Sequence, residues 1–228
     1  MRIGCLGFEL PQGKVKYKDS RLLKLEEKTS PKKTHHFFAE FTQDIESAVA
    51  VVSSKEKSID LFISDLEIVE KRLTKVDSRK EALLNKCNQF LEKETPLSEV
   101  EFSPEELILL KDFPFLTLKP LLILEKLPSD INQLISQVLE KANLIFFYTL
   151  VKSELKSWLI KRGSSVGEAA GKIHSDLAKG FIKAEVINFQ DFINVHNFSE
   201  ARSKGLVKVV GRDYLVQDGD IIEIKFSV

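Results

Sequence analysis

Residues 169–188 near the C-terminal end, AAGKIHSDLAKGFIKAEVIN, constrain the possible fold more than any other stretch of the chain. The pattern predicts a helix, a turn at Gly180 and then a strand. From residue 181 the side chains alternate with a period of two, as in a half-buried strand, with Phe181, Lys183 and Glu185 on one face and Ile182, Ala184 and Val186 on the other. This unit predicts part of a small sheet in which further strands take part.

The segment Leu206–Val228 predicts the hairpin that closes this sheet. Asp218-Gly219-Asp220 has the composition of a tight turn, and apolar runs flank it at Asp213–Val216 and Ile221–Phe226. A polar helix is expected before the hairpin, at Ser199–Lys204. Because the strands and the hairpin all lie within residues 143–228, we expect that fragment to fold by itself.

The charges of the chain balance, which limits the partners that its composition favours. The 228 residues include 34 Lys and Arg against 34 Asp and Glu, so any contact with nucleic acid must come from a local patch. Two isolated cysteines, Cys5 and Cys87, suit a reducing compartment better than a disulfide framework. No apolar run approaches the roughly 20 residues that span a bilayer, and we expect a cytoplasmic protein without a membrane segment.

The N-terminal run Ile3–Phe8 predicts a buried strand of a parallel sheet. Gly7, Gly13 and Lys14 follow where a phosphate-binding loop, G-x-x-x-x-G-K-[S/T], would lie. This version has one residue too many between its glycines, and Val15 replaces the hydroxyl residue that would hold Mg²⁺. Because an extended segment and not a helix is expected after Lys14, the sequence favours an ordinary loop between two strands.

Two amphipathic runs in the middle of the chain, Ser58–Val76 and Ser78–Glu94, predict an antiparallel helical hairpin with a turn and N-cap at Asp77-Ser78. A further helix is expected after Ser103 and an amphipathic one over Asp130–Lys141. Strands are expected at His35–Phe41, at Ile45–Val52 and in the run that ends at Leu124.

The segments AAGKIHSDLAKGFIKAEVI and GRDYLVQDGDIIEIKFSV resemble the C-terminal TGS domain, a β-grasp fold, of the YchF (Obg-like) ATPases. Further residues resemble the family's N-terminal part, namely Asp19, Arg21, Leu22, Leu25, Pro31, Thr34 and the run Phe115-Leu-Thr-Leu-Lys-Pro120. The family's D-x-x-G and N-x-x-E motifs have no counterpart, since Phe41 leads into Thr-Gln-Asp and Leu124 into Glu-Lys-Leu. All three nucleotide elements are therefore altered together.

The resemblance implies an α+β protein in three parts. Residues 1–57 with 111–142 would form a reduced α/β platform, a degenerate G domain. Residues 58–110 would form a helical hairpin like the start of the family's coiled-coil arm. Residues 143–228 would form the TGS β-grasp domain. A sheet that lacks its usual covering helix would protect its exposed face by a repacked segment or by homodimerisation.

No alternative catalytic set is evident. His174 and Asp176 lie two apart, so on one continuous helix they would not face each other, and a surface or capping role is favoured for His174. Ser164-Ser165 precedes a helix and predicts capping. His35-His36 would point to opposite faces of a strand, which argues against a shared metal ion. We predict no catalytic residue, no metal and no cofactor. Because phosphoryl transfer depends on the three altered nucleotide elements, we expect a shortened relative that has lost nucleotide hydrolysis.

The resemblance implies a binding module that contacts RNA, the ribosome or a translation-associated protein. The candidate contacts are the basic residues around the TGS motifs, Lys172, His174, Lys179, Lys183, Arg202, Lys204, Lys208 and Arg212, although nearby carboxylates fit an ordinary mixed surface equally well. One alternative is a residual ATP- or GTP-binding protein or weak ATPase that uses Gly13-Lys14 in a non-standard way. Another is a structural subunit that lends its hairpin to a separate G protein.

Overall fold

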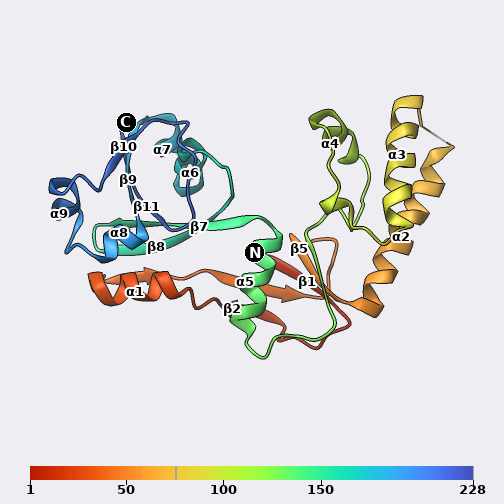
Figure 1. Ribbon diagram of the computed structural model, residues 1–228, viewed down its shortest axis with the longest axis horizontal. Helices are drawn as coiled ribbons and strands as arrows, with labels where there is room; N and C mark the ends of the chain where they lie inside the picture. Colours follow the sequence, from red (N-terminus) through yellow and green to blue (C-terminus); the bar gives the residue numbers. More distant parts are fainter. Residues whose placement is uncertain (75, 228) are drawn as a thin grey trace. The chain divides into compact units, whose positions relative to one another are not determined.

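The computed structural model describes residues 1–74 and 76–227. The chain forms two compact units (Figure 1). Unit 1 contains Met1–Val15 and Ala39–Ala142, and unit 2 contains Lys16–Phe38 and Asn143–Val228. The sequence division had placed residues 16–38 with the first unit.

Unit 1 is built on a five-stranded sheet with the order β2-β4-β1-β5-β6. The strands are β1 (Arg2–Leu6), β2 (Gly13–Lys16), β4 (Phe38–Thr42), β5 (Ala50–Ser54) and β6 (Leu121–Leu124). The central strand β1 is parallel to β4 and β5, and β5 is parallel to β6. Ile3, Gly4 and Cys5 are buried, which confirms the buried parallel strand expected at this position.

The middle of the chain forms two long helices that lie side by side (Figure 1). They are α2 (Lys55–Leu73) and α3 (Ser78–Leu91), and Asp77 caps α3 by accepting hydrogen bonds from two backbone N–H groups. Leu61, Val69 and Leu84 of these helices belong to one buried cluster. The expected pair of helices is confirmed. Three shorter elements complete the unit: η1 (Leu97–Glu99), α4 (Pro104–Leu110) and α5 (Ile131–Lys141).

A buried carboxylate ties α2 to the segment that leads into β6. Asp65 is fully buried and accepts hydrogen bonds from the backbone N–H groups of Leu116 and Thr117, each at 2.8 Å, and from the Thr117 hydroxyl at 2.6 Å. Burial raises the pKa of Asp65, although the three donors act in the opposite direction. The carboxylate therefore fixes the path of residues 116–117 against the helix.

Unit 2 is built on a six-stranded mixed sheet with the order β10-β9-β11-β7-β8-β3. Neighbouring strands are antiparallel except for two parallel pairs, β11 with β7 and β3 with β8. The strands are β3 (Lys33–His35), β7 (Leu144–Val151), β8 (Glu154–Lys161), β9 (Phe181–Asn188), β10 (Lys208–Val210) and β11 (Asp220–Phe226).

The described residues of unit 2 form five helices: α1 (Ser20–Thr29), α6 (Val166–Ile173), α7 (Ser175–Lys179), α8 (Phe189–Ile193) and α9 (Phe198–Ser203). α6 (Val166–Ile173) packs on one face of the sheet, where Val166 and Ala169 join a buried cluster with Ala184, Val186 and Ile222. Helix α1 packs against β8 and α8. Helix α6 begins with a capping box of Ser165 and Glu168, as expected for Ser165.

The hairpin predicted at Leu206–Val228 is wrong. β10 and β11 do not pair with each other, because β9 lies between them and pairs with both. The expected strand Asp213–Val216 makes a single bridge, from Leu215 to Ser165. The Asp-Gly-Asp turn exists, with Gly219 at φ +94°, but it leads directly into β11.

Two of the expected strands are also interrupted in the structure. In β9, Phe226 of β11 pairs with Phe181 and Lys225 pairs with Lys183, so Ile182 is an extra, bulged residue. Ile182 is consequently 61% exposed and does not share the buried face of Ala184 and Val186. The strand expected at His35–Phe41 is two strands, β3 and β4, which belong to different sheets.

No helix within residues 1–74 and 76–227 is long and apolar enough to cross a membrane.

Candidate functional site

The carboxyl ends of β1, β5 and β6 border a cavity of about 560 Å³ in unit 1. Ligands of open parallel sheets bind at this edge. The N-terminus of α2 also reaches the cavity, through Lys55 and Glu56. This is therefore the place at which a nucleotide would be expected.

The three residues of the degenerate phosphate loop, Gly7, Gly13 and Lys14, do not converge on this cavity. Gly7 lines it at the end of β1, with φ +73°, but a Cβ at this position would lie 2.1 Å from the Ser54 Oγ, so the glycine serves close packing against the start of α2. Gly13 and Lys14 lie in β2, which β4 separates from β1. Residues 7–12, all described, form no helix after β1. A phosphate cradle needs its loop to lead into a helix at this point.

The charges around the cavity do not favour a triphosphate either. Glu56 and Glu125 line it against a single ammonium group, that of Lys55. The Ser54 hydroxyl accepts a hydrogen bond from the backbone N–H of Lys57 at 3.3 Å as the cap of α2. Within the described residues, no group of three His, Cys, Asp or Glu side chains is placed to hold a metal ion.

The neutral chain separates its charges between the two units. Unit 2 carries 19 Lys and Arg against 13 Asp and Glu, a formal net charge of +6. Unit 1 carries 15 Lys and Arg against 21 Asp and Glu, a net charge of −6. A positive field over one unit attracts polyanions even when the whole chain is neutral.

The eight basic candidates all lie in unit 2, but they do not form one patch. Lys172 on α6 and Lys179 at the end of α7 are exposed on the helices that cover the buried face of β9. Lys183 belongs to the opposite face, because Ala184 and Val186 next to it point into the helix-covered cluster. Lys208 lies on the edge strand β10. The expected corner of Lys172, Lys179 and Lys183 is thus divided between two faces.

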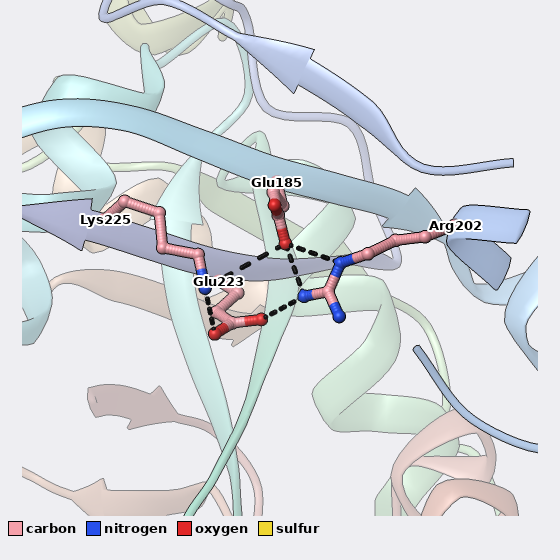
Figure 2. Close-up of polar contacts among 4 residues, drawn as sticks. All are labelled: Glu185, Arg202, Glu223 and Lys225. Atoms are coloured by element: carbon pink, nitrogen blue, oxygen red, sulfur yellow. Dashed lines mark hydrogen bonds and ion pairs between the residues drawn. The ribbon is translucent and has the colours of Figure 1, made fainter. Parts of the chain in front are cut away.

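Arg202 is already engaged by carboxylates of its own unit, as Figure 2 shows. Its Nε and Nη2 lie 3.0 Å and 2.5 Å from Glu185 Oε2, and Nη2 also lies 3.0 Å from Glu223 Oε2. Lys225 Nζ lies 2.5 Å from Glu223 Oε1. The hydrogen bond from Arg202 lowers the pKa of Glu185. This network joins α9 to β9 and β11, and it leaves Arg202 less available for a phosphate.

Two more candidates have local partners that explain them. The Arg212 guanidinium donates to the carbonyl of Ala178 and lies 5.6 Å from the ring centre of Phe181. Lys204 Nζ lies 2.6 Å from Glu200 Oε1. These contacts favour a structural role for both side chains.

His174 and Asp176 do approach each other, contrary to expectation, because the helix expected across them breaks at His174. The His174 Nδ1 accepts a hydrogen bond from the backbone N–H of Asp176 at 3.2 Å and lies 3.5 Å from Asp176 Oδ2. His174 is the N-cap of α7, which confirms the capping role.

Sequence reasoning missed a polar cluster that attaches α1 to the rest of unit 2. The Tyr148 hydroxyl, fully buried, donates to Asp19 Oδ2, and Arg21 Nη1 lies 2.9 Å from Asp218 Oδ2. Asp218 Oδ1 accepts from the backbone N–H of Phe146 at 3.0 Å. Asp19 before an apolar run could have been identified as the N-cap of α1, but no local signal links it to Tyr148.

The same segment contributes most of the net positive charge of unit 2, +4 of +6. Residues 16–38 carry seven Lys and Arg against three Asp and Glu, a net charge of +4. Lys24, Lys32 and Lys33 are exposed. These lysines were not among the predicted contacts because the sequence division assigned them to another unit.

Three comparisons relate this chain to known proteins. A family model described as "YchF-GTPase_C: Protein of unknown function (DUF933)" matches residues 144–227. The "Ribosome-binding ATPase YchF" of Bacillus subtilis is 26% identical over an alignment of 238 residues, and the alignment covers 75% of this chain and 65% of the relative. The protein of the same name from Mycoplasma genitalium is 39% identical over 100 residues, 44% of this chain and 27% of the relative. The chain spans less than two thirds of the length of these relatives.

A solved structure, the YchF GTPase of Schizosaccharomyces pombe, matches with a TM-score of 0.80 and 20% sequence identity. The match covers 96% of this chain and 89% of that one. This likeness extends the similarity of fold to both units.

Proposed function

This chain belongs to the YchF family of Obg-like ATPases, and we propose that it is a cytoplasmic, ribosome-associated member that binds through unit 2 and does not hydrolyse nucleotide. Unit 2 would be the TGS domain, with a β-grasp fold. Unit 1 would be a degenerate G domain, with α2 and α3 as its coiled-coil arm. The "Ribosome-binding" name of the bacterial relatives supports the choice of partner.

The separation of charge carries the proposal of a ribosomal RNA contact. A net charge of +6 on unit 2, with −6 on unit 1, favours binding of a polyanion by one unit only. Lys172, Lys179, Lys183 and Lys208 are exposed on this unit. Lys24, Lys32 and Lys33 of residues 16–38 extend the candidate surface.

Ribosome co-sedimentation at increasing salt tests this proposal. Three groups of Lys→Glu variants separate the surfaces: Lys172 with Lys179, Lys183 alone, and Lys24 with Lys32 and Lys33. A group that contacts RNA should lower the salt slope by about one unit for each lost phosphate contact.

Lys93→Glu with Lys126→Glu, both exposed in unit 1, is the matched control. The control should sediment with ribosomes as the parent does. Binding by all three unit 2 variants with unchanged salt slopes would contradict an RNA contact through this unit.

The proposed loss of hydrolysis rests on the position of Gly13 and Lys14 in β2, away from the cavity at the carboxyl edge of the sheet. Phosphoryl transfer depends on positioning and electrostatic stabilisation, and the lining offers two carboxylates without a phosphate cradle. Isothermal titration calorimetry with ATP and GTP in Mg²⁺ is expected to show no binding tighter than about 0.1 mM, or about 5.5 kcal/mol.

The alternative is a residual nucleotide-binding protein, favoured by the position of that same cavity at the end of β1, β5 and β6. Tighter binding of ATP or GTP, lost in a Lys55→Glu variant, would support the alternative and refute the proposed absence of a nucleotide site. Nuclease treatment of a ribosome pull-down would distinguish an RNA-mediated association from a protein subunit that uses the helical hairpin.

A further inference from the structure

Unit 2 contains an apolar groove of about 540 Å³ between the β7–β8 hairpin, the end of β11 and the helices α6 and α7. Val151 and Phe226 on its sides are 49% and 44% exposed. Its apolar lining also includes Trp158, Ile173, Leu177, Ile222 and Ile224. A groove of this size with mostly apolar walls is typical of a binding site.

Trp158 lies in the groove with its polar atom already satisfied. The indole Nε1–H donates to the Thr149 Oγ1 at 2.9 Å, and the ring stacks on Phe147 at 6.2 Å. The Lys156 ammonium lies over the ring, 3.6 Å from its centre. Because the indole needs no polar partner, the apolar part of a ligand can be accommodated beside it without leaving an unpaired donor.

The rim of the groove is predominantly basic. It is lined by Lys152, Lys156 and His35. Glu154 is the acidic residue of the lining, and its Oε2 lies 3.5 Å from His35 Nε2. The neighbouring strand brings further charge, because the backbone N–H of Lys32 donates to the Ser153 carbonyl and Lys33 is paired with Glu154 in the sheet. Apolar walls beside ammonium groups suit an apolar ligand that carries negative charge.

The turn at one end of the groove has an unusual backbone. Lys152 and Ser153 have φ values of +50° and +64°, in the left-handed region that favours Gly or Asn. Such conformations cost free energy and persist where the surrounding structure imposes them, often at functional sites. Here the turn places the exposed Lys152 at the rim.

We propose that this groove docks a segment of a partner protein that presents apolar side chains flanked by acidic residues. The walls favour a polypeptide over RNA, because five of their seven apolar lining residues are aliphatic and offer no surface on which successive bases could stack, and only Trp158 and Phe226 are aromatic. The apolar side chains fill the groove, and the carboxylates meet Lys152 and Lys156 at the rim. This inference goes beyond the proposed contact with RNA, because its partner is a protein and its surface is apolar.

Trp158 is the single tryptophan of the chain, so its emission reports directly on the groove. The probe is a synthetic 14-residue peptide with leucine at positions 3, 6, 7 and 10 and glutamate at most others. We expect saturable binding to the full chain, with a change in Trp158 emission and an affinity that falls with salt. A peptide with lysine in place of each glutamate should bind at least tenfold more weakly.

Two substitutions of exposed valines in the same sheet form a matched pair. Val151→Asp on the groove should weaken peptide binding at least tenfold. Val209 is 60% exposed on the edge strand β10, and Val209→Asp should leave peptide binding unchanged. Lys152→Glu should also weaken peptide binding and reduce the dependence of the affinity on salt. Circular dichroism checks that each variant is folded. If Val151→Asp does not fold, the Lys152→Glu variant still tests the inference.

Several results would overturn the inference. They are the absence of an emission change with up to 1 mM peptide, equal losses in the Val151→Asp and Val209→Asp variants, and equal binding of the lysine peptide. Binding of a ten-residue oligouridine in place of the peptide, with the same sensitivity to Val151→Asp, would identify an RNA site instead. Ribosome co-sedimentation of the same variants is measured separately, so loss of peptide binding with intact ribosome binding distinguishes this inference from the proposed function.

Discussion

The fragment Asn143–Val228 should not fold stably by itself, because residues 16–38 belong to the same unit. The fragment lacks residues 16–38, and with them both α1 and the edge strand β3. Without them Tyr148 loses Asp19, and Asp218 loses Arg21. This expectation replaces the one drawn from sequence, which assumed a closing hairpin that the structure does not contain.

The size of the effect follows from the buried side chains of α1. Leu22 and Leu25 are 0% and 1% exposed, and burial of each contributes about 1.5–3 kcal/mol. The hydrogen bond from Tyr148 to the Asp19 carboxylate adds about 1 kcal/mol once water replaces the lost partner. The total of about 4–7 kcal/mol compares with a stability of about 4–13 kcal/mol for 86 residues, at about 0.05–0.15 kcal/mol per residue.

Thermal unfolding followed by circular dichroism tests this reasoning. The fragment 143–228 should lack a cooperative transition, and a peptide of residues 16–38 should restore one. A gain of about 4–7 kcal/mol corresponds to a Kd between about 10 μM and about 1 mM. A control peptide with Leu22→Asp and Leu25→Asp should not restore the transition. A fragment that melts cooperatively at the same temperature with and without the peptide would refute the argument.

Three further predictions concern stability and ionisation. Asp65→Ala leaves three buried donors without an acceptor and should cost about 3–5 kcal/mol, seen as a lower urea midpoint at unchanged m value. Burial, with Asp19 nearby, raises the pKa of Tyr148 above its usual 10.0. The neutral Tyr148 hydroxyl therefore stabilises the fold fully below pH 10, and this stabilisation is lost as the pH rises further. In Tyr148→Phe the free energy of unfolding should depend less on pH above pH 10. Arg202 lowers the pKa of Glu185, so the ionised Glu185 stabilises the fold above the pKa that it has in the unfolded chain, and this effect is lost as the pH falls. In Arg202→Leu, an NMR titration should show a higher pKa for Glu185.

Local patterns were sufficient where a helix or a buried strand is defined by its own residues. The three- and four-residue spacing of apolar side chains located α2 and α3, and the sequences at Asp77 and Ser165 located helix caps. The altered spacing after Gly7 indicated a loop between strands, and the structure places Gly13 and Lys14 in β2. These features depend on contacts within a few residues of each other.

Pairing between distant strands could not be predicted in the same way. The Asp218-Gly219 turn specifies a change of direction but not the neighbour of β11, which is β9. The bulge at Ile182 reverses which side chain is buried without any change in the period of the sequence. The position of α1 depends on Asp19 and Tyr148, which are 129 residues apart.

The division of unit 2 between two stretches of chain has a consequence for biosynthesis. Residues 16–38 leave the ribosome long before their partners, because residues 39–142 are made in between. At about 5–20 residues per second, translation of these roughly 100 residues takes about 5–20 s. During this time Leu22 and Leu25 have no completed sheet to pack against, so the nascent chain carries an apolar helix face that chaperones or premature contacts can reach.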